Sequence, residues 1–150
     1  MKRYSFLLLV LPMLIACGES RDGSEEQLVE VADSFSVGYF NYDLQKAKRF
    51  STDDSEKWLQ YIASNIQQED VDILRQQEES ATVQVGEVSY TGDSSAIVNI
   101  SVQNFLKMDS IGKAGVMTDE ADFRLNAHIH NGRWYIRMEG PLRSEKRSHD

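Results

Sequence analysis

Two different spacings of hydrophobic residues divide the chain. Between residues 24 and 66, apolar residues recur at every third or fourth position, which is typical of amphipathic helices. Between residues 81 and 138, apolar and polar residues alternate, which is typical of strands with one buried face. This order predicts an α+β fold, with N-terminal helices packed on one face of an antiparallel sheet of about four strands.

The helical part predicts three helices. The first begins after Ser24, because Ser24 and Gln27 have the spacing of a capping box. A short second helix runs from Leu44 to Phe50, and a third helix contains Trp58 and Ile66. The very polar stretch 67–80 fits either a short fourth helix or an ordered loop. The stripe of the first helix consists of Leu28, Val31, Ala32, Phe35 and Tyr39.

Turn residues separate the predicted strands. Gly86-Glu87 predicts a bulge, because the alternation of valines changes parity there. Residues 107–119 are typical of the tip of a long hairpin. In the last hairpin, Asn131-Gly132 predicts a two-residue type I′ turn. This turn sets Ile129 opposite Trp134 on the apolar face and leaves the polar residues on the other face.

The beginning of the chain has the composition of an export signal. Lys2 and Arg3 precede an apolar run from Phe6 to Ala16, which is too short to cross a bilayer of about 30 Å as a permanent helix. Leu14-Ile15-Ala16-Cys17 resembles the lipobox of bacterial lipoproteins. The resemblance implies that the chain is cleaved before Cys17 and that the thiol of Cys17 receives a diacylglycerol.

The chain is therefore expected to have four segments. Residues 1–16 are the signal peptide, 17–23 a lipidated tether, 24–140 the folded domain and 141–150 a flexible tail. The alternative is an ordinary secretory signal followed by a free or disulfide-bonded cysteine. Cys17 is the only cysteine, so it has no disulfide partner within the chain.

The lipobox resemblance also implies a location and a first partner. The acyl chains on Cys17 would hold the domain at a membrane of the bacterial cell envelope. We expect the outer membrane of a Gram-negative cell, with either the periplasmic or the outer surface possible. Glu19 and Asp22 are too scattered to decide between the two surfaces.

Charge and motif content exclude several classes of function. The chain has 16 Lys and Arg against 24 Asp and Glu, a net charge of -8, which disfavours binding to nucleic acid. The sequence contains no phosphate-binding loop, nucleophile elbow, zinc-protease motif or C-x-x-C pair. His128 and His130 lie on one strand without a third ligand at usable spacing, so we expect neither a metal nor another cofactor.

Three segments carry a family resemblance. They are Phe35-Ser36-Val37-Gly38-Tyr39-Phe40, the following Asn41-Tyr42-Asp43-Leu44-Gln45-Lys46-Ala47, and Asn131-Gly132-Arg133-Trp134-Tyr135-Ile136. In order and spacing they resemble small lipoproteins of unknown function (DUF4878-like) within the NTF2-like, or cystatin-like, superfamily. The resemblance covers residues 25–139. It implies a curved sheet around a long helix, a cone that can hold a small ligand, and a possible homodimer through the sheet.

The resemblance also suggests candidate functional residues. A ligand pocket in the cone would be lined by Tyr39, Tyr42, Trp58 and Trp134, although packing in the core explains both tryptophans equally well. Enzymes of this superfamily place an acid or imidazole base in the cone, and the candidates here are Tyr39, Tyr42, Asp43, His128 and Tyr135. Asp43 is better explained as a helix cap. The alternation predicts an interaction face instead, formed by Arg124, Asn126, His128, Tyr135 and Arg137 together with Asn99 and Ser101.

These observations favour a binding or interaction domain over an enzyme. The expected function is an envelope-tethered lipoprotein that holds a small ligand, a peptide or a partner protein. The alternatives are a small lyase or isomerase with a base in the cone, and an accessory structural subunit of an envelope assembly. We assign no catalytic residue.

Overall fold

The computed structural model describes residues 21–108 and 113–145. The predicted signal peptide 1–16, Cys17 and most of the tether lie outside the described residues, as do residues 109–112 and 146–150. In the described part of the chain, helices come first and strands follow, as the hydrophobic pattern predicts. None of the helices in the described ranges is both long and apolar enough to cross a membrane.

The helical half contains α1 (Glu25–Phe40), α2 (Leu44–Arg49), a short 3-10 helix (Asp53–Ser55), α3 (Glu56–Asn65) and α4 (Gln68–Gln76). The Ser24 hydroxyl accepts a hydrogen bond from the Gln27 N–H at 3.1 Å, which confirms the predicted start of α1. Asp43 caps α2 by accepting from the Lys46 N–H at 3.2 Å. The polar stretch 67–80, which the sequence predicts as either a short helix or an ordered loop, contains α4.

The sheet is antiparallel throughout, in the order β1-β2-β3-β4. Its strands are β1 (Thr82–Gly92), β2 (Ser95–Lys107), β3 (Val116–His130) and β4 (Arg133–Arg137). The predicted bulge lies between Val85 and Val88. Asn131 and Gly132 have φ values of 51° and 79°, as a type I′ turn requires. Pairing of β4 stops at Arg137, because the Met138 N–H donates to the Ser55 hydroxyl at 2.8 Å.

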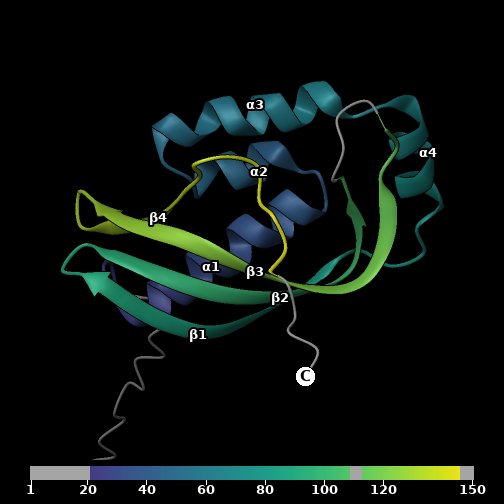
Figure 1. Ribbon diagram of the computed structural model, residues 1–150. Helices are drawn as coiled ribbons and strands as arrows, with labels where there is room; N and C mark the ends of the chain where they lie inside the picture. Colours follow the sequence, from purple (N-terminus) through teal and green to yellow (C-terminus); the bar gives the residue numbers. More distant parts are fainter. Residues whose placement is uncertain (1–20, 109–112, 146–150) are drawn as a thin grey trace, which may run out of the picture.

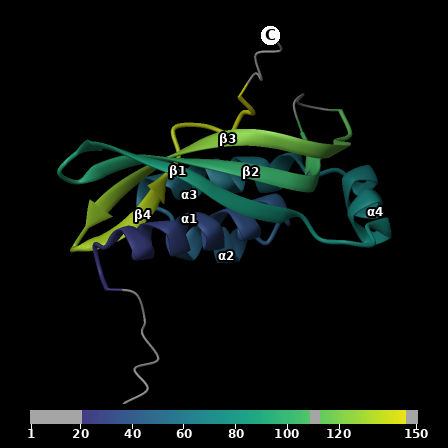
Figure 2. The same cartoon turned by 90° about the horizontal axis from the view of Figure 1, so that it is seen from below.

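The helices and the sheet form two layers. Figures 1 and 2 show α1, α2 and α3 on one face of the curved sheet and α4 at one end of it. Between the layers, three phenylalanine rings meet: the centroid of Phe40 lies 5.3 Å from that of Phe105 and 4.7 Å from that of Phe123. The space between the two layers is therefore filled with packed aromatic side chains at this point.

Chain segments outside the sheet cover two of its strand edges. The Ile136 N–H of β4 donates to the Phe50 carbonyl at 2.8 Å. Beyond the end of β4, the Asp122 carbonyl of β3 accepts from the Glu145 N–H at 2.8 Å. The Leu142 N–H donates to the Tyr39 hydroxyl at 3.0 Å. The predicted flexible tail is therefore attached to the domain as far as Glu145, and its attachment protects an edge of β3.

The end of the predicted tether also belongs to the domain. Gly23 donates its N–H to the Gln27 side-chain oxygen at 2.8 Å, and its carbonyl accepts from the Trp134 indole N–H at 3.2 Å. The Asp22 carboxylate accepts from the Gln27 amide at 3.1 Å. Small and charged residues predicted a flexible segment here, but it is held by the buried Gln27 nearby and by Trp134, which lies 111 residues away from Gly23.

Candidate functional site

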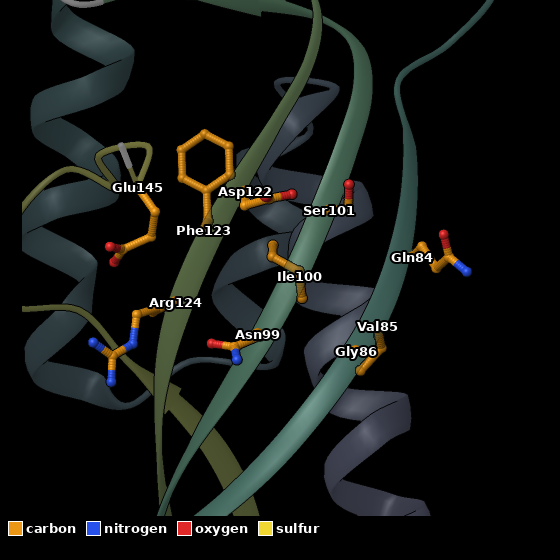
Figure 3. Close-up of a pocket in the computed structure, with 10 residues that line it drawn as sticks. All are labelled: Gln84, Val85, Gly86, Asn99, Ile100, Ser101, Asp122, Phe123, Arg124 and Glu145. Atoms are coloured by element: carbon orange, nitrogen blue, oxygen red, sulfur yellow. The ribbon is translucent and has the colours of Figure 1, made fainter. Parts of the chain in front are cut away.

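The sheet face away from α1 carries a polar groove of about 500 Å³. Alternation in the strands produces this polarity, because the side chains that flank the buried Val98, Ile100 and Phe123 point to the open face. The register places Ser101 beside both Gln84 and Asp122, and Asn99 beside Arg124. Figure 3 shows the lining residues, which are Gln84, Val85, Gly86, Asn99, Ile100, Ser101, Asp122, Phe123, Arg124 and Glu145.

The bulge in β1 explains why this part of the face is hollow. Gly86 lies in the bulge and presents no side chain to the groove. A Cβ atom at Gly86 would lie 3.3 Å from the Asn99 carbonyl oxygen, so glycine keeps the main chain close to β2. The C-terminal segment supplies the opposite side, where the hydrogen bond to Asp122 positions Glu145.

The groove contains charged groups of both signs. The carboxylates of Asp122 and Glu145 and the guanidinium of Arg124 lie along β3 and the C-terminal segment. The Ser101 hydroxyl donates to the Glu120 carboxylate at 3.0 Å at its rim. Arg124 can bind a carboxylate through two parallel hydrogen bonds, and the acidic groups can accept from an ammonium group. The chemistry of the groove therefore suits a ligand that carries both charges.

The predicted interaction residues share this open face, and three of them, Asn99, Ser101 and Arg124, line the groove. The register sets His128 opposite Tyr135 and Asn126 opposite Arg137, as the two-residue turn predicts. Arg137 reaches the edge of the sheet, where its Nε lies 3.3 Å from the Asp54 carboxylate. These four residues form a polar surface that continues from the groove toward the last hairpin.

The two tyrosines predicted to line a pocket are bound to the main chain instead. The Tyr42 hydroxyl donates to the Leu106 carbonyl at 2.8 Å, and the Tyr39 hydroxyl accepts from the Leu142 N–H. Burial raises the pKa of Tyr39 to about 12, although the Leu142 hydrogen bond lowers it. Burial, followed by the nearby Tyr39 and Asp70, raises the pKa of Tyr42 as well. Both hydroxyls stay protonated near neutral pH.

Both tryptophans pack against the core between the two layers, Trp58 from α3 and Trp134 from β4. Trp134 is 2 % exposed, and its indole N–H is bound to Gly23. Trp58 is partly buried against the core, with its ring centroid 6.4 Å from that of Tyr61 and the Lys57 ammonium 5.4 Å from the Trp58 ring. None of the four predicted pocket residues lines the groove on the open face.

The other three candidate residues, Asp43, His128 and Tyr135, lie outside the buried core. Asp43 is exposed and caps α2, whereas His128 and Tyr135 lie on the open sheet face. The acid near Tyr42 is instead the buried Asp70, whose carboxylate oxygens accept from the Gln67 and Gly115 N–H groups. Among the described residues, no group of three or more His, Cys, Asp and Glu side chains is arranged to hold a metal ion.

Sequence reasoning did not find Gln84, Gly86, Asp122 and Glu145 as groove residues. Asp122 could have been found, because it shares the parity of Arg124 on the predicted strand. Gly86 was recognised as part of a bulge, but a bulge alone does not indicate a groove. Glu145 carried no signal, since its position depends on a main-chain hydrogen bond to a distant strand.

Comparisons with known proteins identify the fold. No protein-family profile matches the sequence, and no curated protein matches it. Among solved structures, the chain is similar to an NTF2-like protein of unknown function from Shewanella oneidensis MR-1, with a TM-score of 0.50 and 11 % sequence identity. The similarity covers 74 % of this chain and 92 % of that one. The chain therefore has an NTF2-like fold, while the lipoprotein and narrower family assignments remain predictions.

Proposed function

We propose that this chain is an envelope lipoprotein whose NTF2-like domain binds a small polar ligand on the open face of its sheet. The observation that carries the proposal is the contrast between the two faces. The interior is occupied by packed aromatic rings, and the tyrosine hydroxyls there are bound to the main chain. The open face has a groove in which the exposed Arg124 and Glu145 supply groups of opposite charge. This contrast supports binding over a lyase or isomerase reaction in the cone.

The ligand class follows from the charges in the groove. We propose a zwitterion such as an amino acid or a short peptide, with its carboxylate on Arg124 and its ammonium group near the exposed Glu145. A second copy of the chain is the competing occupant, because a dimer through the sheet would cover the same groove. If the chain is instead an accessory subunit of an envelope assembly, a partner protein would cover this same face.

The binding proposal can be tested on the domain beginning at Arg21. Native mass spectrometry identifies any molecule retained after purification, and thermal unfolding with a panel of amino acids and dipeptides tests added ligand. Binding to the folded state raises the melting temperature. We expect at least one zwitterion to raise it in the wild type and in Arg133→Glu, but not in Arg124→Glu. No shift with any member of the panel and no retained molecule would overturn the proposal.

The lipid anchor rests on Leu14-Ile15-Ala16-Cys17 and on the absence of another cysteine. We propose attachment to the outer membrane of a Gram-negative cell. Cells that express the full chain should incorporate radioactive palmitate into it, and Cys17→Ser should abolish both the label and membrane association. Ser20→Ala is the matched control, because it leaves the lipobox unchanged. An unlabelled wild type, or a Cys17→Ser variant that remains membrane-bound, would contradict the anchor.

A further inference from the structure

The N-terminal segment enters the domain through a buried glutamine. Gln27 is 2 % exposed, and its side-chain oxygen accepts from the Gly23 N–H at 2.8 Å and from the Trp134 N–H at 3.2 Å. Its amide donates to the Asp22 carboxylate. One side chain thus connects the beginning of the described chain to β4, so the position of residues 22 and 23 is fixed relative to the sheet.

Gly23 further defines the point of attachment. Its φ of 75° favours glycine, and a Cβ atom there would lie 3.1 Å from the Gly132 carbonyl oxygen. The segment therefore lies directly against the β3–β4 turn. Figures 1 and 2 show that this turn, the β1–β2 turn and the start of α1 occupy one end of the molecule, with α4 at the opposite end. We call the first of these the hairpin end.

The chain between Cys17 and Arg21 is short compared with the domain. Four consecutive Cα–Cα steps span about 15 Å at most. The 15 residues of β3 alone extend over about 50 Å. An acyl anchor on Cys17 would therefore keep the hairpin end near the lipid surface, whereas α4 lies several tether lengths away.

The chemistry of the hairpin end suits a zwitterionic headgroup layer. Tyr90 is 55 % exposed there, and tyrosine is favoured at membrane–water interfaces because its ring is apolar and its hydroxyl polar. Arg133, the first residue of β4, is exposed, as are the acidic Glu25 and Asp93. Basic groups can contact lipid phosphates and acidic groups can contact lipid ammonium groups.

We propose that the domain stands on the bilayer with its hairpin end against zwitterionic headgroups and α4 directed outward. This orientation rests on the proposed lipid anchor. It presents to partners the end that carries the exposed Val116 and a second groove of about 450 Å³ beside α4.

The orientation can be measured by energy transfer from the protein to labelled lipid. In the acylated protein the sulfur of Cys17 is a thioether, so an introduced cysteine is the only free thiol. Arg133→Cys and Val116→Cys each take one dye, and the purified lipoprotein is placed on phosphatidylethanolamine and phosphatidylcholine vesicles with acceptor-labelled headgroups. We expect transfer from position 133 to exceed that from position 116 roughly threefold or more, given the length of β3.

Two further measurements separate the possible failures. Flotation with vesicles reports the anchor by itself, and a protein that does not float overturns both the anchor and the orientation. A protein that floats but shows equal transfer from both positions overturns the orientation alone. A flexible Gly/Ser insertion of about 20 residues between Ser20 and Arg21 should reduce the difference between the two positions, because it lengthens the tether severalfold.

Discussion

Tyr39 shows how a single hydroxyl links the first helix to the end of the chain. Its ring packs against the core, with its centroid 5.7 Å from that of Phe35, and its oxygen accepts from the Leu142 N–H. The side chain lies in the cone where a ligand was expected. Its hydroxyl instead binds a main-chain group 103 residues away, a partner that no local pattern in the sequence could reveal.

The raised pKa of Tyr39 predicts a loss of stability at alkaline pH. An ordinary tyrosine loses its proton near pH 10, whereas folded Tyr39 keeps its proton up to about pH 12. Raising the pH through this interval therefore favours the unfolded chain. We expect the free energy of unfolding to fall more steeply with pH in the wild type than in Tyr39→Phe, by at most about 1.4 kcal/mol per pH unit.

Urea unfolding from about pH 9 to pH 11.5 measures this difference in slope. Tyr42→Phe should also flatten the profile, because burial raises the pKa of Tyr42 too. Parallel profiles for the wild type and both variants would show that neither tyrosine is protected from ionisation in the folded domain.

At the scale of elements, α4 shows how a helix can depend on a distant residue. Asp70 is fully buried, and its two carboxylate oxygens accept from the Gln67 N–H at 2.8 Å and from the Gly115 N–H at 2.7 Å. The first bond caps α4, and the second joins it to the connection between β2 and β3. Both donors would lack a partner if this carboxylate were removed.

We expect Asp70→Asn to destabilise the domain by about 1–3 kcal/mol, because an amide can accept only one of these bonds and turns a donor toward the other. Hydrogen exchange should accelerate in α4 and at Gly115. The control is Asp72→Asn on the same helix, where the carboxylate is exposed and accepts from Gln68 at 2.9 Å. Equal loss of stability in the two variants would contradict the special role of Asp70.

The elements differed in how far the sequence could predict them. α1 has a local cap, α3 an amphipathic pattern and the last hairpin a characteristic turn, so their identity followed from short-range patterns. For α4 the sequence offered two interpretations, since few apolar residues mark it and Gly115 lies 45 residues from Asp70. The attachment of residues 141–145 was missed for the same reason, because main-chain hydrogen bonds carry no signature in side-chain composition.

At the scale of the whole molecule, the C-terminal segment completes the fold. It covers β3 where β4 has ended, and it covers Tyr39 through Leu142. A chain that stops after Gly140 should expose a pairing edge of β3 and aggregate more readily than one that stops after Glu145. Light scattering during incubation at equal concentration checks this expectation. Equal scattering from the two truncations would contradict the protective role of residues 141–145.

The oligomeric state of the purified domain tests whether the open face binds a small ligand or a second copy of the chain. If the groove holds a small ligand, the purified domain has the mass of one chain, and Arg124→Glu changes ligand retention without changing that mass. This is the expected result. A wild type with the mass of two chains that Arg124→Glu converts to single chains would instead assign the face to a second copy.

The site was less predictable than the fold. The polar parity of the strands correctly placed Arg124 and His128 on one face. The hollow in that face depends on a bulge, on Gly86 and on the returning chain end, which only the assembled molecule brings together. The alternation of residue types along a strand indicates which face of the sheet each side chain occupies. Whether that face contains a groove depends on how the strands and the chain end are arranged in the folded molecule.

The hydrogen bond between Gly23 and the Trp134 indole has a consequence for proteolytic release of the domain from its anchor. A protease that cuts between Ser20 and Arg21 would shed the domain from its anchor and leave the indole and Gln27 contacts in place. A cut after Gly23 would instead separate Ser24, the cap of α1, from the residues that hold it to the hairpin. A shed form beginning at Arg21 should thus melt at the temperature of the anchored protein, and one beginning at Ser24 should melt earlier.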